Sequence, residues 1–261
     1  MNKKLRKKNT AVGIIPARFD SLRLPGKPLV DIGGKPMIQW VVERASRARL
    51  LSKVIVATDD QIILDRVQAF GGNVVMTPKG ISSGSDRVAL VARDMDADVI
   101  VNIQGDEPFI EPQEIDLVAQ IVFENNQSVM GTLVKRIINV EELTSPNIAK
   151  VIIDNQFNAL YFSRSPIPFC RDEKSYEIWI HNHRYYKHVG IYSYRKDFLL
   201  RYAEWEPSPL ERIEKLEQLR ALENGYRIKV AETEFESVCV DTLEDLIKVR
   251  QLVDSGLVVD R

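Results

Sequence analysis

The stretch VGIIPARFDSLRLPGKPL, residues 12–29, sets the expected fold. Its first four residues predict a buried strand, because they are apolar and mostly β-branched and because Pro16 removes the next backbone donor of a ladder. The loop that follows is stiffened by prolines and carries Arg18, Arg23 and Lys27. Positive charges on a stiff loop at the carboxyl end of a strand suit a polyphosphate. An ordinary solvated loop is the alternative interpretation.

The two familiar phosphate-binding motifs are not present in this chain. GxxxxGK[ST] fails because Lys27 is followed by Pro28, and GxGxxG does not occur. The phosphates would therefore be held in another way, and a basic loop with a magnesium ion, as in a nucleotidyltransferase, is one such way.

Composition limits the class of protein. The chain has 261 residues and a net charge of -1, from 36 Lys and Arg against 37 Asp and Glu. This balance gives no field that favours nucleic acid or a membrane surface, so neither is an expected partner. Cys170 and Cys239 lie far apart without CxxC spacing, which predicts free thiols and a cytoplasmic location.

The N-terminal segment, residues 1–10, carries Lys3, Lys4, Arg6, Lys7 and Lys8. We expect a disordered basic tail, with an arm that binds nucleic acid or lipid as the alternative. The apolar stretch after it is too short for a secretion signal or a membrane span. Residues 11–261 are expected to form one nucleotidyltransferase domain with an insertion at about 136–205.

Strands and helices alternate after the basic loop. The expected fold is α/β, a Rossmann-like doubly wound and mostly parallel sheet, because the strands lack the in/out alternation of half-exposed strands. The inserted subregion is expected to carry substrate contacts. We predict strands at 54–57, 73–76, 98–103, 129–134, 151–154, 159–162, 189–194, 228–231 and 238–240, and helices at 37–49, 61–70, 111–125, 208–224 and 242–254.

SSGSDR, residues 82–87, predicts a helix start with Ser85 as its N-cap. Such a turn exposes backbone amides to a ligand. Arg87 in the first turn would oppose the helix dipole, so it has no helical rationale and is a candidate binding residue. A plain capped helix with one tolerated arginine is the alternative.

Asp106 and Asp241 each follow an apolar run expected to be a strand. Ligands of open α/β sheets gather outside the carboxyl ends of strands, so Asp106 is expected to meet the basic loop. Carboxylates there suit Mg²⁺, which is the predicted cofactor. For Asp241 an ordinary residue at a helix start is the alternative. Asp94 and Asp96 form a DxD but precede their strand, so they are expected to be surface residues.

The segment from about 136 to 205 offers residues for substrate contacts. Arg164 lies in SRSPIPF, where its planar fork suits a carboxylate, with surface solvation as the alternative. His188 and Tyr192 could bind a sugar hydroxyl. His181, His183 and His188 fit no zinc motif, and no neighbouring cysteines in the sequence complete a ligand set, so no zinc site is expected.

IPARFDSLRLPGKPL, SGSDR, NIQGDEP, YFSRSPIP, HVGIYSYR, LEQLR and VDTLEDL occur in that order over nearly the whole chain. Together they closely resemble the motifs of the 3-deoxy-manno-octulosonate (Kdo) cytidylyltransferases, the CMP-Kdo synthetases of lipopolysaccharide biosynthesis. The resemblance implies a Rossmann-like fold, a homodimer, magnesium, and an inserted subregion that binds the sugar and forms the dimer contact. It also implies the reaction of CTP with Kdo, a 2-keto-3-deoxy sugar acid, to give CMP-Kdo and pyrophosphate.

The resemblance also implies residue roles. Catalysis would rest on Arg18, Lys27, Asp106 and Asp241, the two aspartates binding magnesium. The nucleotide would contact Pro16, Ala17, Arg18, Lys27, Ser83, Gly84, Arg87 and Gln104. The sugar would contact Gln104, Arg164, His188, Tyr192, Glu217 and Gln218.

Two positions depart from the family pattern: Ile81 stands where the family usually has His, and Ser85 where it usually has Thr. A close Kdo analogue, such as the 8-amino form, therefore stays open as the substrate. A CMP-sialic acid type synthetase shares the first loop, but SRSPIP and LEQLR argue against it. A nucleotide-binding module without turnover is the alternative from a different class.

Overall fold

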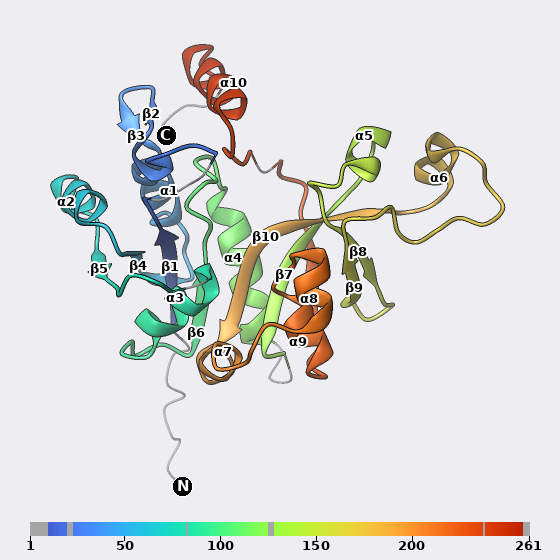
Figure 1. Ribbon diagram of the computed structural model, residues 1–261, viewed down its shortest axis with the longest axis horizontal. Coiled ribbons are helices and arrows are strands. Elements are labelled where there is room, and N and C mark those ends of the chain that lie inside the picture. The colour runs from blue at the N-terminus through green and yellow to red at the C-terminus, as the bar shows by residue number, and fades with distance from the viewer. Residues whose placement is uncertain (1–9, 20–22, 82, 125–127, 237, 258–261) are drawn as a thin grey trace, which may run out of the picture.

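The structure is a computed structural model that describes residues 10–19, 23–81, 83–124, 128–236 and 238–257 (Figure 1). In this part of the chain, one sheet of nine strands has the order β5-β4-β1-β6-β10-β7-β11-β9-β8. Its strands are β1 (Ala11–Ala17), β4 (Leu51–Thr58), β5 (Val74–Met76), β6 (Val99–Asn102), β7 (Met130–Arg136), β8 (Lys150–Ile153), β9 (Asn158–Ser163), β10 (Tyr186–Arg195) and β11 (Ile228–Glu232). A small hairpin joins β2 (Asp31–Ile32) to β3 (Lys35–Pro36).

The helices connect these strands and cover the sheet. They are α1 (Met37–Ala45), α2 (Gln61–Ala69), α3 (Gly84–Ala92), α4 (Pro112–Glu124), α5 (Val140–Thr144), α6 (Tyr176–Asn182), α7 (Lys196–Tyr202), α8 (Pro209–Glu214), α9 (Leu219–Glu223) and α10 (Leu243–Asp254). A 3-10 turn, η1 (Lys27–Leu29), lies in the basic loop. The expected α/β class is confirmed.

The N-terminal half has the predicted doubly wound start. β1 pairs in parallel with β4 and β6, and β4 pairs in parallel with β5. Successive β1 residues point to opposite faces of the sheet. Ile14 packs in an apolar cluster that includes residues of α3 and α7, and Ile15 packs in another that includes residues of α1, α2 and α4. The strand is thus buried on both faces, as its unbroken apolar run predicts.

The expectation of a mostly parallel sheet is wrong for the other half. β10 lies antiparallel between β6 and β7, and β8 and β9 also pair antiparallel, so the sheet is mixed. β10 is buried along most of its length, and a strand covered on both faces has the same apolar pattern in either direction. The sequence pattern therefore could not reveal the reversal.

β8 and β9 form one edge of the sheet, and together with α5 and α6 they project to one side of the molecule (Figure 1). All four fall in the range expected as an insertion, and α5 and α6 share a small apolar cluster. We call the part formed by residues 137–185 the arm. β10 and α7 fall in the same expected range but belong to the main sheet and its covering layer.

The helix expected over 208–224 is two helices, α8 and α9. Lys215 has φ 55° and ends α8 in the left-handed region, so Glu217 and Gln218 lie between the helices. The Glu214 carboxylate accepts hydrogen bonds from the Ser163 hydroxyl at 2.6 Å and the Arg164 backbone N–H at 3.0 Å. These contacts with a distant segment stabilise the break against helical propensity.

Smaller expectations also need correction. Ser83, not Ser85, caps α3 by accepting from the Asp86 N–H at 3.0 Å. His188 lies within β10 rather than before it, and residues 238–240 form no strand. Helix α1 ends at Ala45.

Other expectations concern the tail, the thiols and the membrane. The N-terminal tail prediction falls outside the described residues, except for Thr10. Cys170 and Cys239 are free thiols, as expected. Among the described residues, no helix combines the length and the apolar character needed to cross a membrane.

Candidate active site

Lys27 brings together two carboxylates that lie far apart in the sequence. Its Nζ lies 2.6 Å from Asp106 Oδ2 and 2.7 Å from Asp241 Oδ1. Arg23 Nη2 lies 3.1 Å from the other oxygen of Asp241. The predicted meeting of the basic loop with Asp106 is confirmed, and Asp241 joins the same cluster.

Backbone contacts position the two carboxylates. The Val240 N–H donates to the Asp106 carbonyl oxygen at 2.9 Å, which fixes the two segments side by side. Asp241 then lies directly before α10, whose start is held by a capping box between Thr242 and Asp245. A Cβ on Gly105 would lie 3.1 Å from the Pro16 carbonyl oxygen, so the glycine permits the close approach of the Asp106 loop to the end of β1.

The charge of Lys27 is stabilised by its partners. Burial alone would lower its pKa, but the charge of Asp106 and the hydrogen bonds to Asp106 and Asp241 outweigh burial and raise the pKa of Lys27. The ammonium group therefore stays charged at neutral pH.

The same cluster fits a hard divalent cation. Donor atoms of Asp106, Asp241 and Cys239 all lie within 4.8 Å of one another. Two carboxylates suit Mg²⁺, which takes oxygen ligands and keeps several waters, whereas the softer sulfur of Cys239 does not suit it. Cys239 was not singled out as a site residue, although it precedes Asp241 by only two positions.

Arg18 and Arg87 form a second basic group beside the end of β1. Desolvation and the charge of Arg87 lower the pKa of Arg18, whose Nη2 is buried without a hydrogen-bond partner among the described residues. Arg87 is fully buried, with Nη2 2.6 Å from Asp59 Oδ2 and Nη1 bonded to the Thr77 hydroxyl. An anion beside Arg18 would relieve the repulsion between the two guanidinium groups.

Asp59 was missed at the sequence level. It directly follows β4, which has the same pattern of an apolar strand followed by a carboxylate that pointed to Asp106. Its contact with Arg87 orients that side chain.

The remaining predicted nucleotide contacts lie around the same strand end. Pro16 and Ala17 are the last residues of β1, and Ser83 and Gly84 start α3. A Cβ on Gly84 would lie 3.4 Å from Pro16 Cγ, so the start of α3 packs against the end of β1. Gln104 follows β6 and lies near Gly190 of β10.

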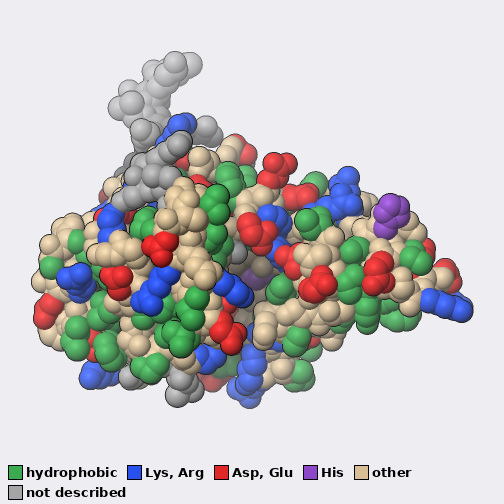
Figure 2. Space-filling model, turned by 90° about the horizontal axis from the view of Figure 1, so that it is seen from above, with side chains coloured by type: hydrophobic (Ala, Val, Ile, Leu, Met, Phe, Trp, Pro, Cys, Tyr) green, Lys and Arg blue, Asp and Glu red, His purple; other side chains and the backbone are tan. Residues whose placement is uncertain are grey.

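A cavity of about 370 Å³ contains part of the predicted sugar set. Acidic and basic side chains surround a hollow in the middle of the face shown in Figure 2. The cavity is lined by Glu107, Lys135, Glu142, Asn147, Ile148, Ala149, Arg164, Lys187, His188, Val189, Gly190, Leu216, Phe235, Glu236 and Cys239. Cys239 connects this cavity with the Lys27 cluster.

Arg164 uses its guanidinium group for backbone contacts. Nε donates to the Glu214 carbonyl at 2.8 Å and Nη1 to the Pro146 carbonyl at 2.9 Å, with longer bonds to the Asn147 and Lys215 carbonyls. Arg164 thus joins two walls of the cavity. Its role toward a substrate carboxylate stays a prediction.

His188 is held as a neutral ring. Its Nε2 lies 2.9 Å from the Thr132 hydroxyl, and the ring packs edge-on against Phe162 at 5.3 Å between centroids. Burial lowers the pKa of His188 to about 3. The side chain can therefore exchange hydrogen bonds but carries no charge at neutral pH.

Glu217 and Gln218 lie in the break between α8 and α9, where Glu217 contacts α3 and Gln218 contacts β10. The Tyr192 hydroxyl donates to Gln218 Oε1 at 3.1 Å, and the Ser85 hydroxyl donates to Glu217 Oε2 at 2.6 Å. Gln218 Nε2 is buried without a partner among the described residues. Ser85, one of the two departures from the family pattern, thus links the start of α3 to the predicted sugar set.

Comparisons with known proteins bear on the family of this chain. A cytidylyltransferase family model matches residues 12–247. The chain is 54% identical over 240 residues to the 3-deoxy-manno-octulosonate cytidylyltransferase of Geobacter sulfurreducens, covering 90% of this chain and 96% of that one. It is 50% identical over 246 residues to the enzyme of the same name from Solibacter usitatus, covering 94% and 95%.

Solved structures extend the comparison. A CMP:2-keto-3-deoxy-manno-octonic acid synthetase complexed with CTP matches with a TM-score of 0.88 and 42% identity, covering 95% of this chain and 100% of that one. A 4-diphosphocytidyl-2C-methyl-D-erythritol synthase from Anaerococcus prevotii, at 13% identity and a TM-score of 0.60, covers 94% of this chain and 99% of its own and shares the fold. The sequence motifs, the fold and these relatives agree, and the chain belongs to the 3-deoxy-manno-octulosonate cytidylyltransferase family.

Proposed function

We propose that the protein transfers the cytidylyl group of CTP to Kdo, giving CMP-Kdo and pyrophosphate for lipopolysaccharide biosynthesis. The observation that carries this proposal is the 54% identity, over 90% of the chain, with a protein named for this activity. The CTP complex of a relative at 42% identity supports CTP as the nucleotide. We place the reaction in the cytoplasm, where CTP is supplied.

In the proposed reaction, the anomeric hydroxyl of Kdo attacks the α-phosphorus in line and pyrophosphate leaves. Catalysis rests on positioning and charge neutralisation, so no covalent intermediate is needed. Arg18, at the end of β1, and Lys27 would hold the triphosphate. The Nη2 of Arg18 is buried and has no hydrogen-bond partner in the described part of the chain, which supports its assignment.

Asp106 and Asp241 would hold a magnesium ion. The closeness of their oxygens and the hardness of carboxylate ligands support this assignment. When bound, the ion would neutralise phosphate charge. Lys27 Nζ lies next to both carboxylates, so it would also lie beside a phosphate that approaches the ion.

The cytosine and ribose would contact Arg87 and the backbone at Ser83 and Gly84, together with Pro16, Ala17 and Gln104. Asp59 holds Arg87 in place, which supports a fixed rather than a mobile contact. The sugar would occupy the cavity beside His188, with Gln104, Arg164, Tyr192, Glu217 and Gln218 around it. Neutral His188 suits a hydroxyl better than a carboxylate.

We also propose a homodimer that buries part of the arm. Several large apolar side chains of the arm are exposed, among them Ile138 and Phe169 at 76% each and Ile178 at 43%. Exposed apolar groups that gather on one projecting part of a molecule indicate a protein contact.

Pyrophosphate release in the presence of CTP and Mg²⁺ tests the proposed function. We expect release with Kdo, weaker release with the 8-amino analogue, and none with sialic acid or without a sugar. The family names of the relatives favour Kdo over the analogue. Release only with sialic acid, a preference for the analogue, or no release with any sugar would overturn the proposal.

A further inference from the structure

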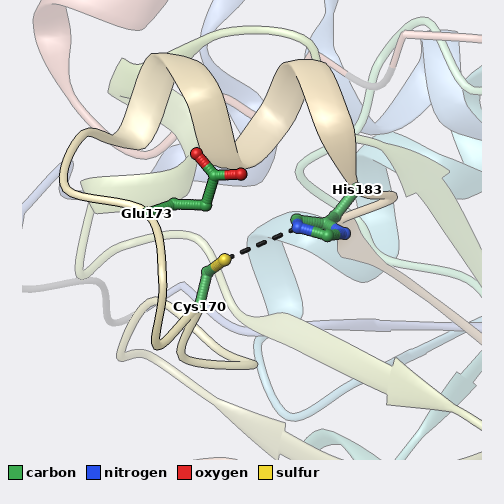
Figure 3. A group of neighbouring side chains, drawn as sticks. All are labelled: Cys170, Glu173 and His183. Carbon is green, nitrogen blue, oxygen red and sulfur yellow. Dashed lines mark hydrogen bonds between the residues drawn. The ribbon is translucent and has the colours of Figure 1, made fainter.

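The arm contains a group of metal-ligating side chains outside the candidate active site. The sequence predicted no zinc site because no cysteine lies near the histidines in the chain. Folding nevertheless brings Cys170, which is 13 residues away in the sequence, next to His183, with Glu173 beside them (Figure 3). Donor atoms of the three side chains lie within 4.8 Å of one another.

The distance between sulfur and nitrogen fits a shared metal ion. Cys170 Sγ lies 3.5 Å from His183 Nε2. Two ligands on a tetrahedral zinc, with bonds of about 2.3 Å to sulfur and about 2.0 to 2.1 Å to nitrogen, lie about 3.6 Å apart. An ion could therefore replace the hydrogen bond without moving these two atoms apart.

Contacts around the group hold its ligands in place. The Glu173 carboxylate accepts from Asn182 Nδ2 at 2.9 Å, and the Glu173 carbonyl accepts from Trp179 Nε1 at 2.9 Å. The His183 N–H donates to the Trp179 carbonyl at 2.9 Å. Such outer contacts orient metal ligands, and here they connect the loop at 170–173 with the end of α6.

Burial and charge also suit a bound cation. Cys170 and Glu173 are half-buried, while His183 is exposed, so an ion could enter from solvent. A thiolate, a carboxylate and a neutral imidazole balance the charge of a divalent ion, and the thiol proton leaves to solvent.

We propose that Cys170, Glu173 and His183 form a binding site for a borderline divalent cation, Zn²⁺ first of all. Water would complete the tetrahedral coordination. The arm has a small buried apolar core, which consists of Ile137, Leu143, Trp179 and Tyr185. A metal ion that joins the loop at 170–173 to the end of α6 would stabilise the arm. The proposal does not depend on the function of the active site.

Titration of the chelator-treated full-length chain with Co²⁺ tests this site, because cobalt bound to thiolate gives a charge-transfer band in the near ultraviolet. We expect the band to saturate at one equivalent and Zn²⁺ to displace it. Cys170→Ser should abolish the band, and His183→Gln should weaken Co²⁺ binding by more than about 100-fold. Asn182→Ala should weaken it by roughly 10- to 100-fold, as for lost outer contacts.

Matched controls separate this site from its neighbours. His181→Gln alters a histidine of the same helix outside the group, and Cys239→Ser removes the other thiol, which lies beside two carboxylates. Both variants should keep the band. Zn²⁺ should raise the Tm of the native chain and not that of Cys170→Ser. No band with native protein, or a band that survives Cys170→Ser and is lost in Cys239→Ser, would overturn the proposal.

Discussion

Replacement of Lys27 by methionine should make the stability of the protein depend on magnesium. The substitution keeps most of the apolar stem and removes the ammonium that lies 2.6 and 2.7 Å from Asp106 and Asp241. Two carboxylates would then face each other without the cation that joins them.

The structure sets the size of the effect. Carboxylate oxygens of Asp106 and Asp241 lie within 4.8 Å, and two like charges at about that distance repel by about 3.5 kcal/mol at an effective dielectric constant of about 20. Their side chains are 27% and 37% exposed. Solvent and salt therefore reduce the expected loss in free energy of unfolding to roughly 1 to 2 kcal/mol.

Urea denaturation with and without Mg²⁺ measures this effect. We expect Lys27→Met to lose stability without magnesium and to regain it with magnesium, because an ion can take the place of the ammonium. The native chain should gain less, since there the ion competes with Lys27. Lys35→Met is a matched control, because Lys35 pairs with Glu43, at 2.8 Å, outside the Asp106 and Asp241 cluster. Equal magnesium responses in the native chain and Lys27→Met would refute the reasoning.

Three further changes test the surroundings of the site. Arg164→Lys should raise the KM for Kdo far more than the KM for CTP, because lysine cannot reproduce the hydrogen bonds to carbonyls on two walls of the cavity. The expected loss in sugar binding is about 1 to 3 kcal/mol. Equal effects on the two KM values in steady-state kinetics would contradict this. Arg220→Met should lower the free energy of unfolding by about 3 to 5 kcal/mol in urea, because it leaves the buried carboxylate of Glu211 unpaired; a loss below about 1 kcal/mol would refute it. His188 has a pKa of about 3 in the folded chain and 6.5 as its ordinary value, so only the unfolded chain takes up its proton between these values. The free energy of unfolding should therefore fall as the pH is lowered through this window, by up to about 1.4 kcal/mol per pH unit. A His188→Asn variant with the same pH dependence as the native chain would contradict this.

The first half of the fold followed from local patterns. The apolar run of β1, its prolines and the alternation of strands with helices predicted parallel pairing, and the rule for strand ends predicted that Asp106 would meet Lys27. The same rule applied to β4 would have found Asp59. Asp241 joins the cluster as expected although no strand precedes it, because the N–H of the neighbouring Val240 binds the Asp106 carbonyl instead.

Other features depend on contacts between distant segments. The apolar pattern of a buried strand is the same in either direction, so the sequence of β10 does not show that the strand is antiparallel. The break between α8 and α9 at Lys215 depends on contacts with Ser163 and Arg164, about 50 residues away in the chain. Cys170 and His183 have 13-residue spacing, which matches no motif, and their approach depends on the fold of the arm. Sequence reasoning could not reach these features without tertiary structure.

The most direct test of the central claim is the rate of pyrophosphate release from CTP and Kdo by the native chain and by Asp106→Asn and Asp241→Asn. An amide keeps the shape of the side chain and loses the charge that a magnesium ion needs. We expect each variant to lose about 100-fold or more in turnover at saturating Mg²⁺, while circular dichroism shows the native fold. Turnover close to that of the native chain in either variant would contradict the assignment of that carboxylate to the reaction.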